Sequence, residues 1–178
     1  MVPTLQYHNK PLYESTVVGE FLEDAYPDHG LKLLPSDPYQ RAVGRIWADF
    51  VTSRVIPSFH RFLQFQPGQS SKPIEELRSD FLSNLRQFAE AMEDNGPFFF
   101  GQEPSLVDFV MAPWAIRLWV FDHFKSDHGG LGAPAEGEGG EREKSWSRWR
   151  KWLAAIEERP SIKGTTSERE KYLSIYQR

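Results

Sequence analysis

The sequence contains no cysteine, so its 178 residues can form no disulfide, thiolate metal site or cysteine nucleophile. Neither sign of charge is in large excess: 21 Lys and Arg stand against 25 Asp and Glu, and the net charge of −4 argues against nucleic acid as a partner. No apolar run approaches the roughly 20 residues that a membrane span needs. The sequence also shows no secretory signal. From these absences we expect a cytoplasmic protein with neither a nucleic-acid nor a membrane partner.

Common catalytic and phosphate-binding motifs are absent as well. The sequence has no G-x-S-x-G, no H-E-x-x-H and no G-x-x-x-x-G-K-[ST] segment. His123 and His128 are near each other, but their spacing does not suit a pair of metal ligands on one helix. Exposed loop histidines are the better interpretation, and we predict no metal site.

Aromatic residues and helical periodicity are what the sequence has in quantity. Its 6 Trp and 13 Phe predict a well-filled core or an apolar cleft. Apolar residues recur at helical spacing, and prolines or capping residues mark the ends of several of these stretches. We predict helices over 16–26, from Asp37 to a kink at Pro57, over 73–92, from Ser105 through Trp119, over 146–158 and over 167–176.

These stretches divide the chain into two unequal parts. Residues 1–27 have the pattern of two short strands and a helix, which rarely form a domain of their own. Residues 28–37 are punctuated by glycine and proline, as linkers are. Residues 38–178 form a helical domain, in which 126–144 lacks periodicity and is predicted to be a mobile loop. The predicted fold class is therefore mainly α.

The opening segment MVPTLQYHNKPLYES contains the most specific candidate site. A cis bond between Val2 and Pro3 would turn the valine N–H and C=O away from the sheet, where a peptide ligand could pair with them. Glu14 and Ser15 lie where a helix begins; the N–H groups there favour a carboxylate, and Glu14 can accept from an ammonium group. The simpler interpretation of these residues is an ordinary hairpin in which Ser15 caps the helix.

Three segments, in order, resemble the glutathione transferase family. VPTLQYHNKPLYES followed by VVGEFLEDAYPD resembles the second half of its thioredoxin-like domain. LLPSDPYQRA is similar to the linker and first domain-two helix of the fungal, omega-like class, and SLVDFVMAPWAIRLWVF looks like that class's capping-box helix. The likeness runs from Val2 to about Phe124 and, more loosely, from Trp146 to Pro160. It implies an all-helical C-terminal domain preceded by a partial thioredoxin-like β-β-α unit.

The resemblance implies roles for residues of the opening segment, with glutathione as co-substrate and no metal. Pro3 becomes a cis-proline. The backbone of Val2 contacts the cysteinyl part of glutathione, and Glu14 and Ser15 hold its γ-glutamyl end.

The resemblance also concerns the helical domain. Ser105 and Asp108 become a capping and folding element rather than catalysts. The cleft for a second substrate would lie between the two domains, and the weaker candidates for its wall are Trp47, Phe50, Trp114 and Arg117.

The family's first β-α-β unit, which carries an activating Cys, Ser or Tyr, has no counterpart in the sequence. We therefore expect no catalytic residue within it and place that residue upstream of Met1. The full-length form is expected to be a homodimer that transfers glutathione to electrophiles or reduces thiol or disulfide substrates. The alternative is a non-catalytic, transferase-like protein-interaction module. Glu14 and Ser15 favour the transferase, whereas the missing nucleophile favours the module.

Overall fold

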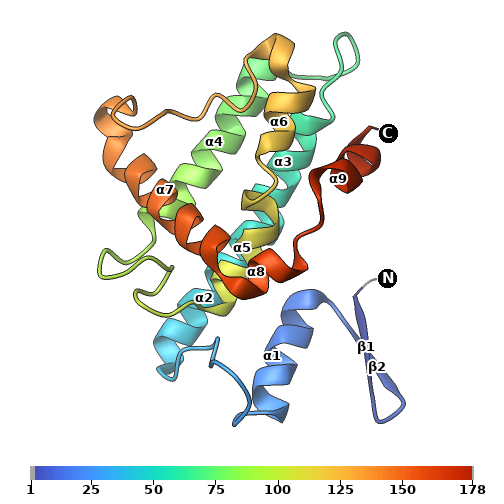
Figure 1. The fold of residues 1–178 in the computed structure, drawn as a ribbon, viewed down its shortest axis with the longest axis vertical. Coiled ribbons are helices and arrows are strands. Elements are labelled where there is room, and N and C mark those ends of the chain that lie inside the picture. Colours follow the sequence, from blue (N-terminus) through green and yellow to red (C-terminus); the bar gives the residue numbers. More distant parts are fainter. Residues whose placement is uncertain (1–2, 178) are drawn as a thin grey trace.

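A computed structural model describes residues 3–177, which are mostly helical (Figure 1). Strands β1 (Thr4–Tyr7) and β2 (Lys10–Tyr13) precede helix α1 (Ser15–Ala25). The predicted class, mainly α with a β-β-α unit before the helical part, is confirmed. The helical part contains α2 (Pro38–Phe50), α3 (Ile56–Leu63), α4 (Ile74–Glu90), α5 (Leu106–Ala115), α6 (Trp119–Phe124), α7 (Glu143–Glu158), α8 (Pro160–Thr165) and α9 (Arg169–Tyr176).

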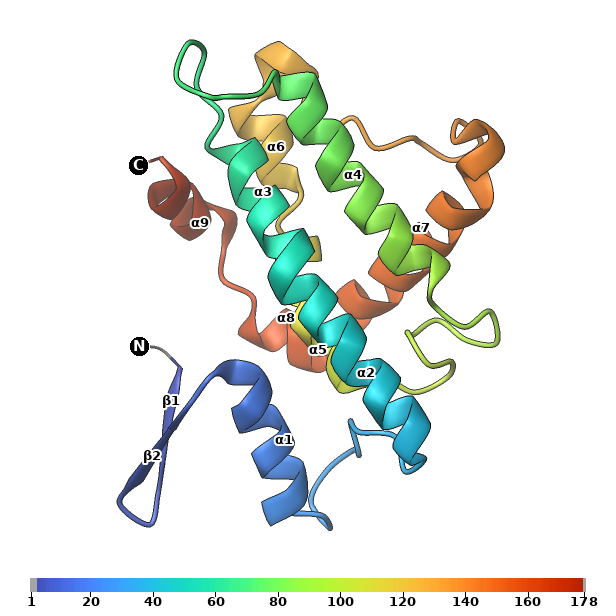
Figure 2. The same ribbon diagram turned by 180° about the vertical axis from the view of Figure 1, so that it is seen from behind.

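The two strands form an antiparallel hairpin in which Thr4 lies opposite Tyr13. Its turn residues, His8 and Asn9, have positive φ values of 46° and 62°, the backbone twist that suits a two-residue hairpin loop. The ring of Tyr7 lies 4.9 Å from that of Phe21, centroid to centroid, and joins the hairpin to α1. The hairpin and α1 lie together at one end of the molecule (Figures 1 and 2).

Helix α1 follows the predicted boundaries closely but is only loosely covered. It has no buried residue, and Val17 and Leu22 of its apolar stripe are 53% and 43% exposed. The linker that follows α1 is hydrogen-bonded both to α1 and to the start of α5. The Glu23 carboxylate accepts from the Leu33 N–H at 3.0 Å, and the Leu33 carbonyl accepts from the Leu106 N–H at 2.9 Å. The linker thus joins α1 to the start of α5.

The distortion expected at Pro57 is a π-helical stretch, Val51–Val55, between α2 and α3. Proline has no N–H to donate, and its ring crowds the carbonyl four residues earlier, so the helix widens there. Ile46 of α2 points outward although it is apolar, since it is 65% exposed. Gly44 and Ala48 form the buried side of α2. Ile46, two residues from each of them, projects to the opposite side of a helix that turns about 100° per residue.

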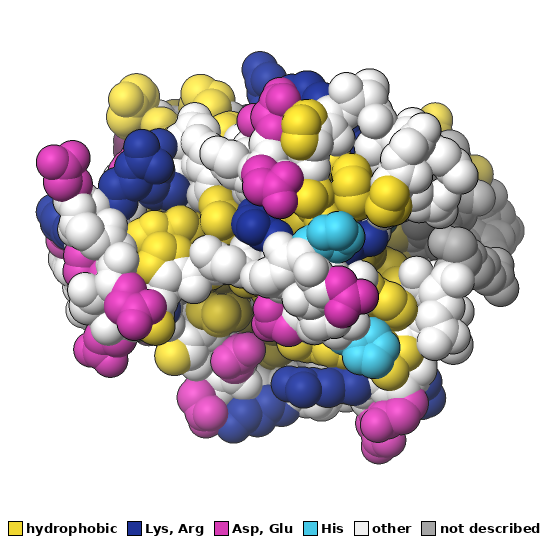
Figure 3. All heavy atoms as spheres, turned by 90° about the horizontal axis from the view of Figure 1, so that it is seen from above, with side chains coloured by type: hydrophobic (Ala, Val, Ile, Leu, Met, Phe, Trp, Pro, Cys, Tyr) yellow, Lys and Arg dark blue, Asp and Glu magenta, His cyan; other side chains and the backbone are white. Residues whose placement is uncertain are grey.

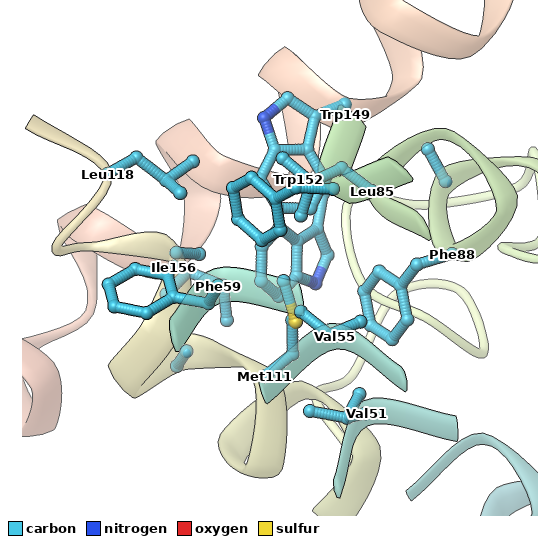
Figure 4. Packing of buried hydrophobic residues seen from close by; sticks show 14 of the residues in the cluster. Val51, Val55, Phe59, Leu85, Phe88, Met111, Leu118, Trp149, Trp152 and Ile156 are labelled. Carbon is cyan, nitrogen blue, oxygen red and sulfur yellow. The ribbon is translucent and has the colours of Figure 1, made fainter. Parts of the chain in front are cut away.

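The core lies among α3, α4, α5 and α7 (Figure 4). Phe59, Phe88, Met111 and Trp152, one from each of these helices, are fully buried. Burial of side chains of this size contributes roughly 1.5–3 kcal/mol each. This core fixes the helices against which α1 and the linker pack.

Two boundaries differ from those predicted. The apolar run from Ser105 does not continue as one helix through Trp119, because α5 ends at Ala115 and α6 begins at Trp119. Helix α7 begins at Glu143, inside the segment predicted as a loop, and the short 3-10 turns Ser126–His128 and Gly140–Arg142 also lie in that segment.

Candidate functional site

The sharpest local feature of the opening unit is the start of α1. Glu14 is the N-cap and has φ 69° and ψ 110°, a left-handed backbone that is rare outside glycine. Ser15 is the first helical residue, so the simpler interpretation, in which Ser15 caps the helix, does not hold. Both side chains are exposed. Pro3 is exposed too, whereas Val2 lies outside the described residues.

The first turn of α1 has unused capacity to bind an anion. Within the described part of the chain no side chain caps the helix, and its first turn holds no acidic residue. The first N–H groups of a helix have no partner inside it, and they lie at the positive end of the helix dipole. A carboxylate can therefore bind here, with the Ser15 hydroxyl as a further donor.

A pocket of about 210 Å³ opens beside this turn, between α1, the linker, α2 and the start of α5. Thr16 and Glu20, one helical turn apart, form its α1 side. Gly19 lets α1 approach α5 closely, because a Cβ atom there would lie 3.0 Å from the Leu106 side chain. The other walls come from Leu33, Leu34, Pro35, Gly44, Arg45, Ala48, Asp49, Thr52, Phe100, Ser105, Leu106 and Val107.

An ion pair connects α1 and α2 across the pocket. The Arg45 guanidinium donates to both carboxylate oxygens of Glu20, Nε to Oε1 at 3.0 Å and Nη2 to Oε2 at 2.7 Å. These hydrogen bonds from Arg45 lower the pKa of Glu20 below its usual range. Sequence reasoning missed both residues because they are 25 positions apart, and no local pattern marks the pair.

The four residues expected to line a second-substrate cleft do not line this pocket. Trp47 and Phe50 pack on each other, with ring centroids 4.9 Å apart. The ring of Trp114 lies 5.4 Å from that of Phe59, and the Arg117 guanidinium lies 4.7 Å from the ring of Tyr172. The structure places these four residues against other parts of the helical domain, while Thr16, Glu20 and Arg45 occupy the space beside α1.

Ser105 and Asp108 form a buried capping box at the start of α5. The Asp108 carboxylate accepts from the Ser105 N–H at 2.7 Å and from the Ser105 hydroxyl at 2.8 Å. It also accepts from the Phe99 N–H at 2.9 Å and from the Trp152 indole N–H at 2.7 Å. Asp108 is fully buried, and its carboxylate is occupied by these donors rather than directed at the pocket.

The surface carries charges of both signs. On the face seen from above in Figure 3, Lys and Arg side chains are intermixed with Asp and Glu around exposed apolar side chains. No helix within residues 3–177 is long and apolar enough to cross a membrane. Among these residues no group of three or more His, Asp and Glu is arranged to hold a metal ion.

Comparison with known proteins shows which protein family the chain resembles. A family model described as "Glutathione S-transferase, C-terminal domain" matches residues 72–155. The chain is 31% identical over 123 residues to "Probable glutathione S-transferase parC" of Nicotiana tabacum, covering 69% of this chain and 53% of that protein. It is 34% identical over 120 residues to "Glutathione S-transferase omega-1" of Sus scrofa, covering 66% and 47%. The chain therefore spans about half the length of these curated relatives.

A solved structure extends the likeness to nearly the whole chain. The crystal structure of glutathione transferase Omega 3C from Trametes versicolor superposes with a TM-score of 0.74 at 34% sequence identity. The match covers 95% of this chain and 68% of that one, so it extends well beyond the residues 72–155 that the family model matches.

Proposed function

The chain belongs to the glutathione S-transferase family, and on that premise we propose that it binds glutathione at the start of α1. The γ-glutamyl carboxylate of glutathione would accept from the first N–H groups of α1 and from the Ser15 hydroxyl. The γ-glutamyl ammonium would donate to the Glu14 carboxylate. The backbone of Val2, held by a cis Pro3, would pair with the cysteinyl part.

The observation that carries this proposal is the backbone of Glu14. A non-glycine residue at φ 69° costs on the order of 1–3 kcal/mol, and such residues cluster at ligand-binding sites. Glu14 occupies the N-cap position of α1, and within the described residues no side chain caps the first turn. A simple capped hairpin would need neither feature.

The pocket beside α1 is proposed to take part of the second substrate. Its walls are apolar at Leu33, Leu106 and Phe100 and charged at the Glu20–Arg45 pair. An electrophile or a mixed disulfide with an apolar body suits a pocket with apolar walls and one ion pair. We place the protein in an omega-like class, on the likeness to the Trametes and pig proteins.

Calorimetric titration of two peptides tests the proposed role of Glu14 and Ser15. Glutathione should bind. The Glu14→Gln and Ser15→Ala substitutions should each lower the affinity for glutathione by roughly tenfold or more, the usual effect of losing a charge-assisted hydrogen bond. Cys-Gly lacks the γ-glutamyl group, so neither substitution should change its binding. Asp24→Asn, at an exposed position near the other end of α1, is the matched control and should leave glutathione affinity unchanged.

Equal losses for glutathione and Cys-Gly, or none for glutathione, would contradict the assigned site. A chain that folds, as judged by circular dichroism, yet binds no glutathione would instead support the non-catalytic interaction module.

A further inference from the structure

A second pocket lies on the helical domain, away from α1. It has a volume of about 490 Å³ and is formed by α4, the connection between α6 and α7, and the first turn of α7. Figure 2 shows this connection passing beside α4. Of the α4 side chains in its wall, Ser79, Ser83 and Arg86 are spaced three or four residues apart, and Arg78 adjoins Ser79, so they share one side of the helix.

The pocket is basic in an acidic chain. Three arginines, Arg78, Arg86 and Arg142, line it with one lining carboxylate, Glu75, and Arg86 is also paired with Glu90 at 2.6 Å, while the whole chain has a net charge of −4. The Ser79 and Ser83 hydroxyls add neutral donors. This excess of hydrogen-bond donors and positive charge suits a doubly charged oxyanion.

Part of the donor capacity is unused. The Nε atoms of Arg78 and Arg86 are buried and have no hydrogen-bond partner among the described residues. The nearby carboxylates already have partners. Glu90 accepts from Arg86 and from the Ser145 hydroxyl, and Glu143 accepts from Arg150 and from the N–H of Gly139. Glu90 thus bonds the Arg86 guanidinium through Nη1, and the Nε–H groups of Arg78 and Arg86 have no acceptor among the described residues.

The connection is held close to Arg78. The Arg78 guanidinium donates to the His128 carbonyl, and a Cβ atom at Gly132 would lie 3.2 Å from the Arg78 Cδ. Gly132 has φ +67°, so glycine meets both the steric and the conformational demand. The buried Trp146 side chain also lines the pocket and supplies its aromatic surface.

We propose that this pocket binds a phosphate monoester with an apolar body. The phosphate group, close to −2 at pH 7.5, would lie among Arg78, Arg86 and Arg142 and accept from the serine hydroxyls, with its organic group on Trp146. The site is separate from the glutathione site and does not depend on the proposed function.

Calorimetric titration of the full chain with phenyl phosphate tests the proposal, with inorganic phosphate and neutral benzyl alcohol as comparison probes. Phenyl phosphate should bind more tightly than inorganic phosphate, and benzyl alcohol should give no measurable heat. Arg142→Glu should lower the affinity for phenyl phosphate by at least about tenfold. Glu75→Gln, which removes the carboxylate that lines the pocket, should raise the affinity for phenyl phosphate. Both residues are exposed, so these variants are expected to fold, which circular dichroism checks.

Arg61→Glu is the matched control, because Arg61 is an exposed arginine of α3 outside the pocket. It changes the net charge equally and should alter affinity by less than about twofold once salt screens it. No heat with phenyl phosphate would overturn the proposal. So would equal losses in Arg142→Glu and Arg61→Glu, or an Arg142→Glu variant that binds as the unmodified chain does.

Discussion

At the scale of single residues, Asp108 shows how much of the domain one buried carboxylate can organise. Its partners are the start of its own helix, the loop residue Phe99 and the indole of Trp152 in α7. The Ser105–Asp108 spacing predicts the capping box, because both partners lie within one turn. The contact with Trp152, 44 positions away, has no local sequence signal.

Asp108→Ala should lower the free energy of unfolding by at least about 3 kcal/mol, because it leaves several buried donors unpaired. This exceeds the roughly 0.5–2 kcal/mol of a lost helix cap alone. Asp94→Ala is the control: Asp94 pairs with Lys144 at the surface, and its loss should cost less than about 1 kcal/mol. Urea unfolding measures both, and equal effects would show that the buried network is not what stabilises this corner.

His60 gives a pH dependence whose sign can be worked out. Burial lowers the pKa of His60 below its usual value of 6.5. The unfolded chain therefore takes up a proton at this residue before the folded protein does. Stability should fall as the pH drops below about 6.5.

Replacing His60 should flatten this part of the profile. Urea unfolding between pH 7.5 and 5.5 should show a smaller loss of stability in His60→Gln than in the unmodified chain. His123→Gln, at an exposed position, serves as the control. A His60→Gln profile that falls as steeply as the control's would show that another group is responsible.

At the scale of elements, local signals predicted the helices better than their interruptions. Strong apolar periodicity and terminal prolines gave α1 and α4 within two residues. The break between Ala115 and Trp119 lies in a continuous apolar run, where periodicity alone cannot distinguish one helix from two. The start of α7 at Glu143 is set by side-chain to backbone bonds rather than by apolar periodicity, since the Glu143 carboxylate accepts from the N–H of Gly139 in the preceding turn.

Limited digestion with a glutamate-specific protease tests the connection between α6 and α7. Residues 135–138 are exposed and lie outside helices and strands, so the first cuts should follow Glu136 and Glu138. Mass spectrometry of the early fragments identifies the sites. A first cut within α1 or α4, with the connection intact, would mean that hydrogen bonds such as that from Leu131 N–H to Asp122 protect it fully.

At the scale of the whole molecule, the resemblance in the sequence predicted the order of the parts and the mainly α class. It did not predict how α1 meets the helical part, because Gly19, Glu20 and Arg45 act through contacts between distant segments.

The exposed side of α2 is relevant to how whole molecules associate. Tyr39 and Ile46 are 76% and 65% exposed, and seven residues apart they lie on one side of α2.

We propose that this side of α2 contributes to a homodimer. Sedimentation velocity should then show a dimer for the unmodified chain and a shift toward monomer for Ile46→Asp. Ile175→Asp, at a 61% exposed position on α9, should leave the distribution unchanged. Identical distributions for all three proteins would contradict this interface.

The central claim is that glutathione binds at the start of α1, and backbone amide chemical shifts measured during a glutathione titration test it most directly. The N–H groups of Ser15, Thr16 and Val17 should shift most and saturate together, because they would donate to the γ-glutamyl carboxylate. The same amides should shift little in Ser15→Ala at equal concentration. Saturable shifts centred on another part of the chain, with these three amides unmoved, would contradict the account.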